Sequence, residues 1–398
     1  MFKHASIIPL IGGETIGSEQ AYGTRPEYLL SYTPFQNHDQ HIINWYDKEV
    51  PYYLIDKGEN APYKVDIIAS VCPCAGLSQL SHGYGDSNRN NDWLITSAKY
   101  VLGELKPKVY WGENAPGLAG TIGTNIRESI RSIGEQNGYT MSLYRTKSLL
   151  HGLSQVRERA FYFFWKDTRT PLLNYYKKPY EKIEDTILNA KGNSQQEVIN
   201  SKKPSADPYY IFTLNEIHNG ISHAEFCKTV EPGNARNSDV LSYIERMGVS
   251  WDTLANWMRA NGYEKEYHKN LERKKKLEAG GAIMKRGTII PKEYIGAFVG
   301  QYPTMLMHPV YDRYITYREA MTIMGLPDSF ELIDAKKNVN HICQNVPVQT
   351  ARDMATEVMA YLDGKRQMIN SNYTFQYNHR QMHETRNASS ADLSSFMD

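Results

Sequence analysis

The chain has 398 residues, a length that suits two or three domains and a core that needs no disulfide or metal ion to hold it together. It carries 45 Lys and Arg against 44 Asp and Glu. This balance of charge excludes a histone-like protein that coats a polyanion, although it permits a local basic face. The four cysteines are too few for a disulfide framework, and Cys72 and Cys74 have no nearby Cys or His pair at zinc spacing. We therefore expect no metal site.

The ends of the chain and its apolar runs indicate where the protein works. The N-terminal stretch MFKHASIIPLIGG has too short an apolar run for a signal peptide. No stretch of the sequence approaches the apolar length of a membrane span. We expect a cytoplasmic protein that does not contact the membrane.

Strands and helices alternate through residues 1–166. The pattern predicts strands at 64–71, 109–113, 138–144 and 160–165, and helices at about 91–106 and 122–136. This alternation with short connections favours an α/β fold with a doubly wound, mostly parallel sheet. Ligands of such sheets bind beyond the carboxyl ends of the strands, where the loops PCAGLS and GENAPG fall.

The alternation fades over 167–304, which we expect to form a second domain. Lys and Arg number 21 in 166–304 against 17 Asp and Glu, and a helix near 251–278 contains the run ERKKK. Such a run is more often a solvated helix face than a nucleic-acid site. An ordered pattern returns over 305–365, with helices at REAMTIMG and at about 348–362. Residues 366–398 are poor in aliphatic side chains, which predicts a disordered tail.

Cys74 stands in a Pro/Gly loop between a predicted buried strand and a helix. Backbone N–H groups at such a turn stabilise a thiolate, so Cys74 is a candidate nucleophile. A single cysteine taken alone is more often a small, buried and inert side chain. Glu113, at the end of the next strand, makes a nucleophilic role for Cys74 more plausible. A carboxyl between Trp111 and Pro116 can have a raised pKa, which makes it a candidate proton donor or hydrogen-bond anchor.

The segment Gln155–Arg159 opens a further strand with two cations. Side chains at Arg157 and Arg159 share one face of that strand, where they can clamp a phosphate or a polarised carbonyl. The alternative is a pair of surface arginines.

These pieces in this order resemble the DNA cytosine-5 methyltransferases. The family's nucleophile loop matches Pro73, Cys74, Gly76 and Ser78. Its Glu–Asn motif matches Glu113 and Asn114. Its Gln–x–Arg–x–Arg motif matches Gln155, Arg157 and Arg159. Its ninth motif matches His308, Pro309, Arg313, Thr316, Arg318, Glu319, Gly325, Pro327 and Asp328. Its last motif matches Asn345, Val346 and Pro347, with Gln344 where glycine is usual.

The resemblance implies a class I methyltransferase fold, a Rossmann-like mixed sheet whose catalytic domain comprises 1–166 and 305–365. It implies that 167–304 is a smaller target-recognition domain and that the partner is double-stranded DNA. The oligomeric state stays open, with a monomer as the default expectation. It further implies that Cys74 adds to C6 of a flipped-out cytosine, that Glu113 holds N3 and the exocyclic amine, and that Arg159, with Arg157, holds the base carbonyl. DNA contacts are expected from Ser78, Arg89, Gln155 and Thr316.

The resemblance also implies S-adenosylmethionine as methyl donor, with Gly12, Gly13, Asp56, Pro73, Asn345 and Val346 in its site. This half of the pattern departs from the family. Ile8 stands where an aromatic is usual and Leu10 where the first glycine is usual. The family's ribose-binding glutamate has no clear match, and Asp39 is the nearest acid.

Three alternatives stay open at this point. A modified donor such as carboxy-S-adenosylmethionine would need a cation or extra hydrogen-bond donors near the transferred carbon, and Arg25, Lys57 and the amide of Gln344 are the candidates to supply them. A DNA-binding relative without activity would have no reason to keep Cys74, Glu113 and Arg159. An RNA methyltransferase on the same scaffold is the third, although the long middle segment favours duplex DNA. The compact length suits a prokaryotic or phage modification enzyme.

Overall fold

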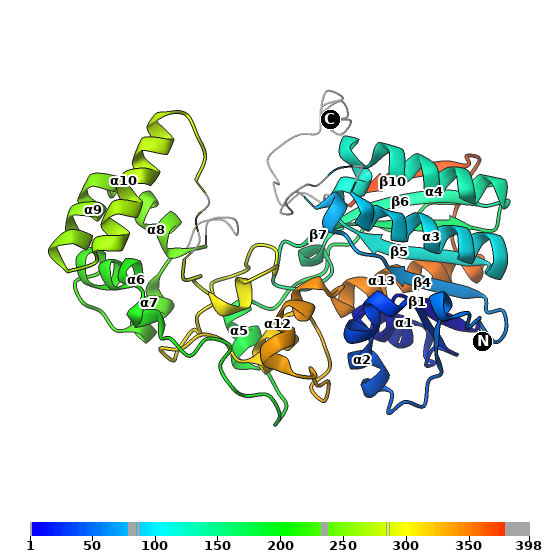
Figure 1. Ribbon diagram of the computed structural model, residues 1–398, viewed down its shortest axis with the longest axis horizontal. Coiled ribbons are helices and arrows are strands. Elements are labelled where there is room, and N and C mark those ends of the chain that lie inside the picture. Colours follow the sequence, from blue (N-terminus) through cyan, green and yellow to red (C-terminus); the bar gives the residue numbers. More distant parts are fainter. Residues whose placement is uncertain are drawn as a thin grey trace.

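The protein is described from a computed structural model, in residues 2–78, 85, 88–231, 238–283, 285 and 287–378. Within these ranges an eight-stranded sheet has the order β10-β6-β7-β5-β4-β1-β2-β3 (Figure 1). Its strands are β1 (His4–Ile7), β2 (Leu29–Ser31), β3 (Tyr52–Leu54), β4 (Ile67–Val71), β5 (Val109–Asn114), β6 (Thr140–Lys147), β7 (Glu158–Trp165) and β10 (Tyr373–Tyr377). Strand β7 runs antiparallel to both neighbours, and the other pairs are parallel. The predicted α/β fold with a Rossmann-like mixed sheet is confirmed.

The central strands are apolar because both faces of the sheet are covered. Every residue of β7 after Glu158 is buried. Trp111 of β5 stacks on Phe163 of β7 with ring centroids 6.0 Å apart, and Phe163 stacks on Trp165 at 5.2 Å. These aromatic pairs fix the register of β7 against β5, on which the site depends.

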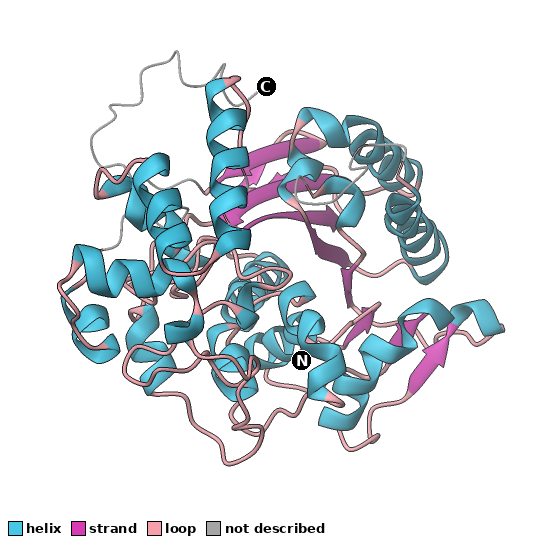
Figure 2. Ribbon diagram, turned by 60° about the vertical axis from the view of Figure 1, so that its left-hand side comes forward, coloured by secondary structure: helices cyan, strands magenta, loops and turns pink. Residues whose placement is uncertain are grey.

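Helices cover both faces of this sheet (Figure 2). Helices α3 and α4 lie on one face, whereas α1 and α13 pack together on the other (Figure 1). Helix α1 approaches α13 so closely at Gly17 that a Cβ there would lie 2.7 Å from the Cβ of Ala351. The helices around the sheet are α1 (Gly13–Tyr22), α2 (Gln36–Trp45), α3 (Asp92–Tyr100), α4 (Thr124–Gln136) and α13 (Val348–Leu362).

A second apolar cluster joins the sheet to the rest of the molecule. It contains Ile11 and Ile42, which lie beside the sheet, and Phe298 and Phe330, which come later in the sequence. Its helices are α5 (Ile183–Leu188), α11 (Tyr317–Ile323) and α12 (Ala335–Gln344).

The remaining helices form a lobe of their own on the left of Figure 1. A third apolar cluster, which includes Tyr210, Phe226 and Met258, holds them together. These helices are α6 (Pro208–Phe212), α7 (His223–Thr229), α8 (Val240–Arg246), α9 (Trp251–Ala260) and α10 (Glu264–Glu278). The helix predicted at 251–278 is broken between α9 and α10, where Gly262 adopts φ 81°. We call α6–α10 the helical lobe.

The end of the described chain corrects one expectation. The tail predicted to be disordered from 366 contains two strands, β9 (Met368–Ile369), which pairs with β8 (Thr170–Pro171), and β10, which pairs with β6. The segment is ordered by hydrogen bonds rather than by aliphatic burial, since Asn378 bonds both Tyr176 and Thr146. Residues 379–398 lie outside the described ranges. Among the described helices, none has the length and apolar character needed to cross a membrane.

Candidate active site

The candidate nucleophile and the candidate acid come from neighbouring parallel strands. Cys74 follows β4 and precedes a short helical turn at Ala75–Leu77, and Glu113 lies one residue from the end of β5. Strands β4 and β5 pair in parallel with Val71 opposite Glu113. Their carboxyl ends therefore meet at one edge of the sheet, as the sequence predicts.

Arg159 reaches the same edge because β7 is antiparallel. Its position is second in β7, so it lies beside the end of β5 rather than at the far end of the sheet. Its Nε lies 2.5 Å from Glu113 Oε1, and its Nη1 donates to the carbonyl of Glu158 at 2.7 Å. Glu113 is 3% exposed and Arg159 9%, so the ion pair is largely desolvated.

Opposing influences set the protonation of these groups. Burial raises the pKa of Glu113, and the guanidinium groups of Arg159 and Arg157 oppose that rise. Burial also raises the pKa of the Cys74 thiol, which Arg159 lowers and Glu113 raises further. A thiol and a carboxyl that both hold protons more tightly than usual thus share one arginine, an arrangement typical of reactive sites.

Arg157 and Arg159 have different surroundings. The Nη1 of Arg157 donates to the carbonyl of Phe298 at 2.9 Å, and its Nη2 donates to the carbonyl of Asn345 at 3.1 Å. Arg157 is therefore engaged with backbone from two later segments, close enough to influence Cys74 and Glu113 by charge. The arrangement makes Arg157 a residue that positions the site, while Arg159 faces the acid directly.

Two residues expected to touch DNA are buried, and we correct their roles. Gln155 is fully buried, and its Nε2 donates to the carbonyl of Ile323 at 3.1 Å. Thr316 is 3% exposed and caps helix α11, where its hydroxyl accepts from the amide of Glu319. Each side chain is occupied by these hydrogen bonds in the structure. The spacing of residues in the sequence could not show whether Thr316 caps a helix or contacts DNA.

The other two expected DNA contacts flank a stretch that is only partly described. Ser78 is half-buried after the Cys74 turn, and Arg89 is exposed in the turn Arg89–Asn91. Residues 79–84, 86 and 87 lie outside the described ranges. At Gly76 an added Cβ would lie 2.3 Å from Asn91 Oδ1, so the two turns touch there.

The loop after β1 is tied to the last motif. Gly13 N donates to Asn345 Oδ1 at 2.8 Å, and a Cβ on Gly13 would lie 2.1 Å from the carbonyl of Val346. Gly12 adopts φ 98°. Ile8 and Leu10, where the family has an aromatic and a glycine, also have left-handed φ values of 54° and 51°. Left-handed backbone at a β-branched residue is strained, and such strain is characteristic of functional loops.

Several buried polar atoms beside this loop make no well-aligned hydrogen bond within the part of the chain that is described. They are Ser31 Oγ, Tyr32 OH, Asp39 Oδ1 and the Nδ2 of Asn345. Asp39 is fully buried, its Oδ2 accepts from Tyr52 OH at 2.8 Å, and burial raises the pKa of Asp39 to about 7. Buried polar atoms without well-aligned partners are costly in a protein interior, and a bound polar ligand is one way to satisfy them. The residues at the ends of β1 and β2 therefore fit a polar cofactor.

Sequence reasoning noted Asp39 only as the nearest acid. Its position three residues before Ile42, on the buried face of α2, is the signal that an inward-pointing carboxyl was present. Asp56 lies in the helical turn Ile55–Lys57 that follows β3 and is exposed, and both of its carboxylate oxygens accept from the amide of Thr33, at 2.9 and 3.1 Å. Pro73 is half-buried beside Cys74.

The groups considered for a carboxylated donor are placed differently. Arg25 pairs with Glu49 at 2.5 Å on the surface, and Gln344 Oε1 lies 2.9 Å from His38 Nε2. Lys57 is exposed. Among the described residues, no contact of these three side chains marks one of them as a partner for a donor carboxylate.

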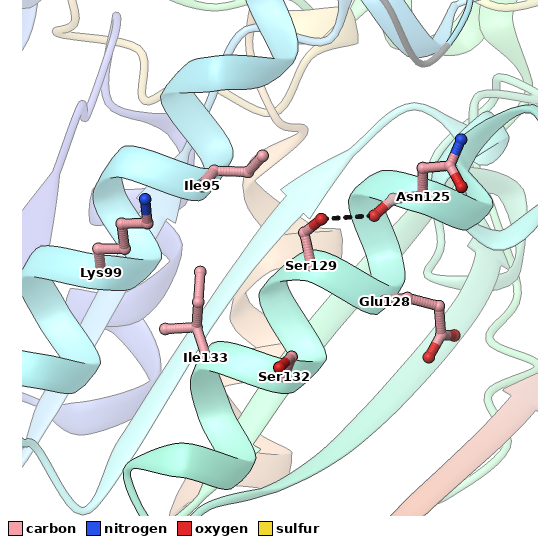
Figure 3. A pocket seen from close by; sticks show the side chains of 7 residues that line it. All are labelled: Ile95, Lys99, Asn125, Glu128, Ser129, Ser132 and Ile133. Carbon is pink, nitrogen blue, oxygen red and sulfur yellow. Dashed lines mark hydrogen bonds between the residues drawn. The ribbon is translucent and has the colours of Figure 1, made fainter.

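A shallow pocket between α3 and α4 lies apart from these residues. Figure 3 shows Lys99 and Ile95 of α3 facing α4, where Ser129 Oγ donates to the carbonyl of Asn125 at 2.7 Å. None of the candidate site residues lines it. In the described ranges, no group of three His, Cys, Asp or Glu side chains is arranged to hold a metal ion.

Comparisons with known proteins agree with this geometry. The family model for C-5 cytosine-specific DNA methylase matches residues 2–360. Type II methyltransferase M.DdeI of Desulfomicrobium norvegicum is 21% identical over 67% of this chain and 63% of its own length. Type II methyltransferase M.AgeI of Thalassovita gelatinovora is 28% identical over 26% of this chain and 24% of its own. The chain thus spans less than two thirds of either relative.

A solved structure shares the fold. The DNA modification methyltransferase encoded within an E. coli prophage superposes with a TM-score of 0.55 at 15% identity, covering 91% of this chain and all of that one. At this identity the likeness supports the fold and leaves the chemistry to the site residues.

Proposed function

Because the chain belongs to the C-5 cytosine-specific DNA methylase family, we propose that it transfers a methyl group from S-adenosylmethionine to C5 of a cytosine in duplex DNA. The observation that carries this proposal is the convergence of Cys74, Glu113 and Arg159 at one edge of the sheet. A cytosine inside a duplex is out of reach of such a buried edge, so the base is flipped out of the stack.

Cys74 acts as the nucleophile. Its thiolate forms a bond to C6 of the ring, and the electron pair of the C5–C6 double bond becomes available at C5. Arg159 supports this step because its charge favours the thiolate over the thiol. Once C5 had taken the methyl group, with the methyl–sulfonium bond of the donor breaking to leave a neutral thioether, loss of the C5 proton and breaking of the sulfur–C6 bond would restore the aromatic ring and free Cys74.

Glu113 holds the base while charge develops. Its carboxyl, whose pKa is raised by burial, can keep a proton for N3 and accept from the exocyclic amine. Arg159 fixes that carboxyl at 2.5 Å and can also bind the base carbonyl. Arg157 contributes by holding the backbone of Asn345 and Phe298 around the site.

The donor binds at the ends of β1, β2 and β3. When bound, S-adenosylmethionine supplies the electrophilic methyl group. Gly12 and Gly13 allow close backbone approach, Asn345 and Val346 brace that loop, and Pro73 and Asp56 flank it. Asp39, with Ser31, offers an acceptor for a ribose diol in place of the family's missing glutamate.

The helical lobe supplies target recognition, and DNA lies between it and the sheet. Ser78 and Arg89, on either side of the partly described stretch, contact the phosphate backbone. A monomer is sufficient for this reaction, because all the proposed catalytic groups come from one chain.

The test is mass spectrometry of nucleosides from DNA of bacteria that lack cytosine methylation and express the protein. We expect deoxycytidine heavier by one methyl group. The Cys74→Ser variant should lower turnover by roughly 10³-fold or more while it still binds duplex DNA.

The outcomes that contradict the proposal are specific. Unmodified DNA with modified RNA nucleosides would assign an RNA substrate. A larger mass increment would assign a modified donor. Full product from Cys74→Ser would remove the covalent mechanism.

A further inference from the structure

Three histidines join helix α2 to helix α12 (Figure 1). His41 Nε2 lies 3.0 Å from His341 Nδ1, and the ring of His38 stacks on that of His341 with centroids 3.8 Å apart. The amide of Ile333 donates to His41 Nδ1 at 3.1 Å. His41 is 1% exposed and His341 8%, so the contact between these two rings lies away from water. We call His38, His41 and His341 the histidine cluster.

The hydrogen bonds of the cluster run in one direction. Because the Ile333 amide can only donate, His41 Nδ1 must accept, and the proton of that neutral ring lies on Nε2. His41 Nε2 then donates to His341 Nδ1, which leaves the proton of the second ring on His341 Nε2. The Ile333 peptide is held in place, since its carbonyl accepts from Asn338 Nδ2 at 2.7 Å. A proton added to His41 or His341 would therefore set two N–H groups against each other.

The electrostatics of the cluster agree with this geometry. Burial, together with the neighbouring charge of His38, lowers the pKa of His41 to about 4 and that of His341 to about 3. His38 is only half-buried, and its Nδ1 has no hydrogen-bond partner among the described residues. A first proton can therefore sit on His38 without breaking a bond, and its charge would oppose a second proton on the stacked ring.

Nearby carboxylates offer these rings little compensation for a positive charge. The other titratable side chains of α2, of α12 and of the segment that joins Phe330 to α12 are bound to other partners or exposed. They are Asp39, Glu331, Asp334, Lys336, Lys337 and Cys343. The cluster is therefore stable in its neutral form and has no counter-ion of its own in the described chain.

The same two helices border the proposed donor site. Immediately after His41, α2 presents Ile42, against which an added Cβ on Gly12 would lie at 2.3 Å. Helix α12 ends one residue before Asn345, whose Oδ1 accepts from Gly13 N at 2.8 Å. The separation of α2 and α12 therefore affects both sides of the loop that carries Gly12 and Gly13.

We propose that the histidine cluster holds α2 against α12 only while His41 and His341 are both neutral, so that acid weakens donor binding by parting the two helices. This inference rests on the proposed function, because the donor is there bound beside Gly12, Gly13 and Asn345. His41 and His341 are positioning residues, which act on the donor through the elements that they hold. Their pKa is lower in the closed arrangement than the ordinary 6.5, so the contact is fully favoured above that value and weakens as pH falls below it.

The test is isothermal titration calorimetry of S-adenosylhomocysteine at about pH 7.5 and about pH 5.5, on either side of the ordinary imidazole pKa. In His341→Asn, the new Oδ1 keeps an acceptor for His41 and cannot titrate. In His41→Gln, the new Nε2 keeps a donor to His341. His268→Asn is the matched control, because His268 is an exposed histidine of α10 that lies 3.1 Å from Glu264.

For each protein the affinity at the lower pH is divided by its own affinity at the higher pH, so that a general change in affinity cancels. The loss on acidification should be about tenfold smaller in His341→Asn than in the wild type, since an ordinary imidazole is about ten times more often charged than neutral at the lower pH. Asp39, whose pKa is raised to about 7, is present in every variant, and its contribution cancels as well. His41→Gln should change the ratio in the same direction, and the control should keep the wild-type ratio.

An equal ratio in the wild type and His341→Asn would overturn the proposal, as would a wild-type affinity that does not fall with acid. A control that lost its pH dependence equally would place the effect outside the cluster. Failure of both cluster variants to fold would make the cluster a general stabilising element and would also overturn the proposal. If the wild-type protein bound no S-adenosylhomocysteine at the higher pH, the proposed donor site would fail by itself, before any variant was measured.

Discussion

The two halves of the site differ in how their polar groups are satisfied. In the chemistry half, Glu113 and Arg159 pair with each other at 2.5 Å, and Arg157 binds two backbone carbonyls. In the donor half, Ser31, Tyr32 and Asp39 bury polar atoms that find no well-aligned partner in the described chain, and so do Glu113, Arg157 and Arg159 in the chemistry half. What differs is the charge: the first half holds a carboxyl against a guanidinium, whereas the Asp39 carboxyl of the second accepts from the neutral hydroxyl of Tyr52. The sequence departs from the family pattern in the second half, at Ile8 and Leu10, and matches it in the first.

Among the variants that test this comparison, the largest effect is expected from breaking the Glu113–Arg159 pair in the chemistry half. Arg159→Ala removes the cation that both fixes Glu113 and favours the Cys74 thiolate, so turnover should fall by about 10²-fold or more. Since Arg159 lowers the pKa of Cys74, its loss should also move the rise of rate with pH to higher pH. A pH profile of kcat measures both effects.

The matched control for that variant is Arg131→Ala. Arg131 also pairs with a glutamate, Glu135, at 3.1 Å, but on the outer surface of α4. The Arg131→Ala variant should have the same pH profile of kcat as the wild type. If the Arg159→Ala enzyme kept wild-type turnover, Arg159 would have no role in the mechanism. The ion pair would then not distinguish the chemistry half from the donor half.

In the donor half, Asp39→Asn tests whether the carboxyl without a full set of partners binds the cofactor. Neutralising it should weaken binding of S-adenosylhomocysteine by about tenfold, the loss of one charge-assisted hydrogen bond. Isothermal titration calorimetry measures the affinity without any turnover. The analogue that lacks the ribose 2′-hydroxyl should lose less affinity on the same substitution.

Tyr52→Phe is the control, because it removes the bond from Tyr52 to Asp39 and keeps the charge. If Tyr52→Phe weakened binding as much as Asp39→Asn, or if the deoxy analogue suffered equally, Asp39 would support the loop rather than touch the ligand.

The smallest expected effect is on stability and concerns Glu14, a buried acid whose carboxyl oxygens are hydrogen-bonded, in contrast to Asp39. Glu14 in α1 is 1% exposed and accepts from Ser6 and Ser18, each at 2.7 Å. Burial raises the pKa of Glu14 above its unfolded value, so the stability it contributes is fully present below the unfolded pKa and is lost as pH rises through the folded pKa. The advantage of Glu14→Gln over the wild type should therefore be larger at pH 8 than at pH 5, by about 1.4 kcal/mol for each unit by which folding raises the pKa of Glu14 within that range.

Denaturant unfolding at the two pH values measures this gain, and S-adenosylhomocysteine binding should stay unchanged. Parallel stability curves would show that Glu14 does not titrate with folding. A loss of ligand binding would place Glu14 with Asp39 in the donor half.

The sequence alone was sufficient for the central strands and for the meeting of Cys74 with Glu113 at one edge of the sheet. The strands at 64–71, 109–113 and 160–165 are long apolar runs, a local signal that follows from burial on both faces. Cys74 and Glu113 end neighbouring parallel strands, so their meeting follows from the fold class. The match of short motifs in a fixed order then indicated the family, which the family model over 2–360 confirms.

Only the tertiary structure decided what depends on partners distant in the sequence. The antiparallel direction of β7 brings Arg159 to Glu113, and no local pattern fixes that direction. Gln155 and Thr316 lie in matching motifs, yet their hydrogen bonds bury them. The polar segment ending at Asn378 carries a disorder-like composition, and it is ordered because Leu173, Tyr176 and Thr146 meet its side chains. Composition reports how much apolar surface a segment can bury, whereas hydrogen bonds to remote backbone depend on geometry that exists only once the chain has folded.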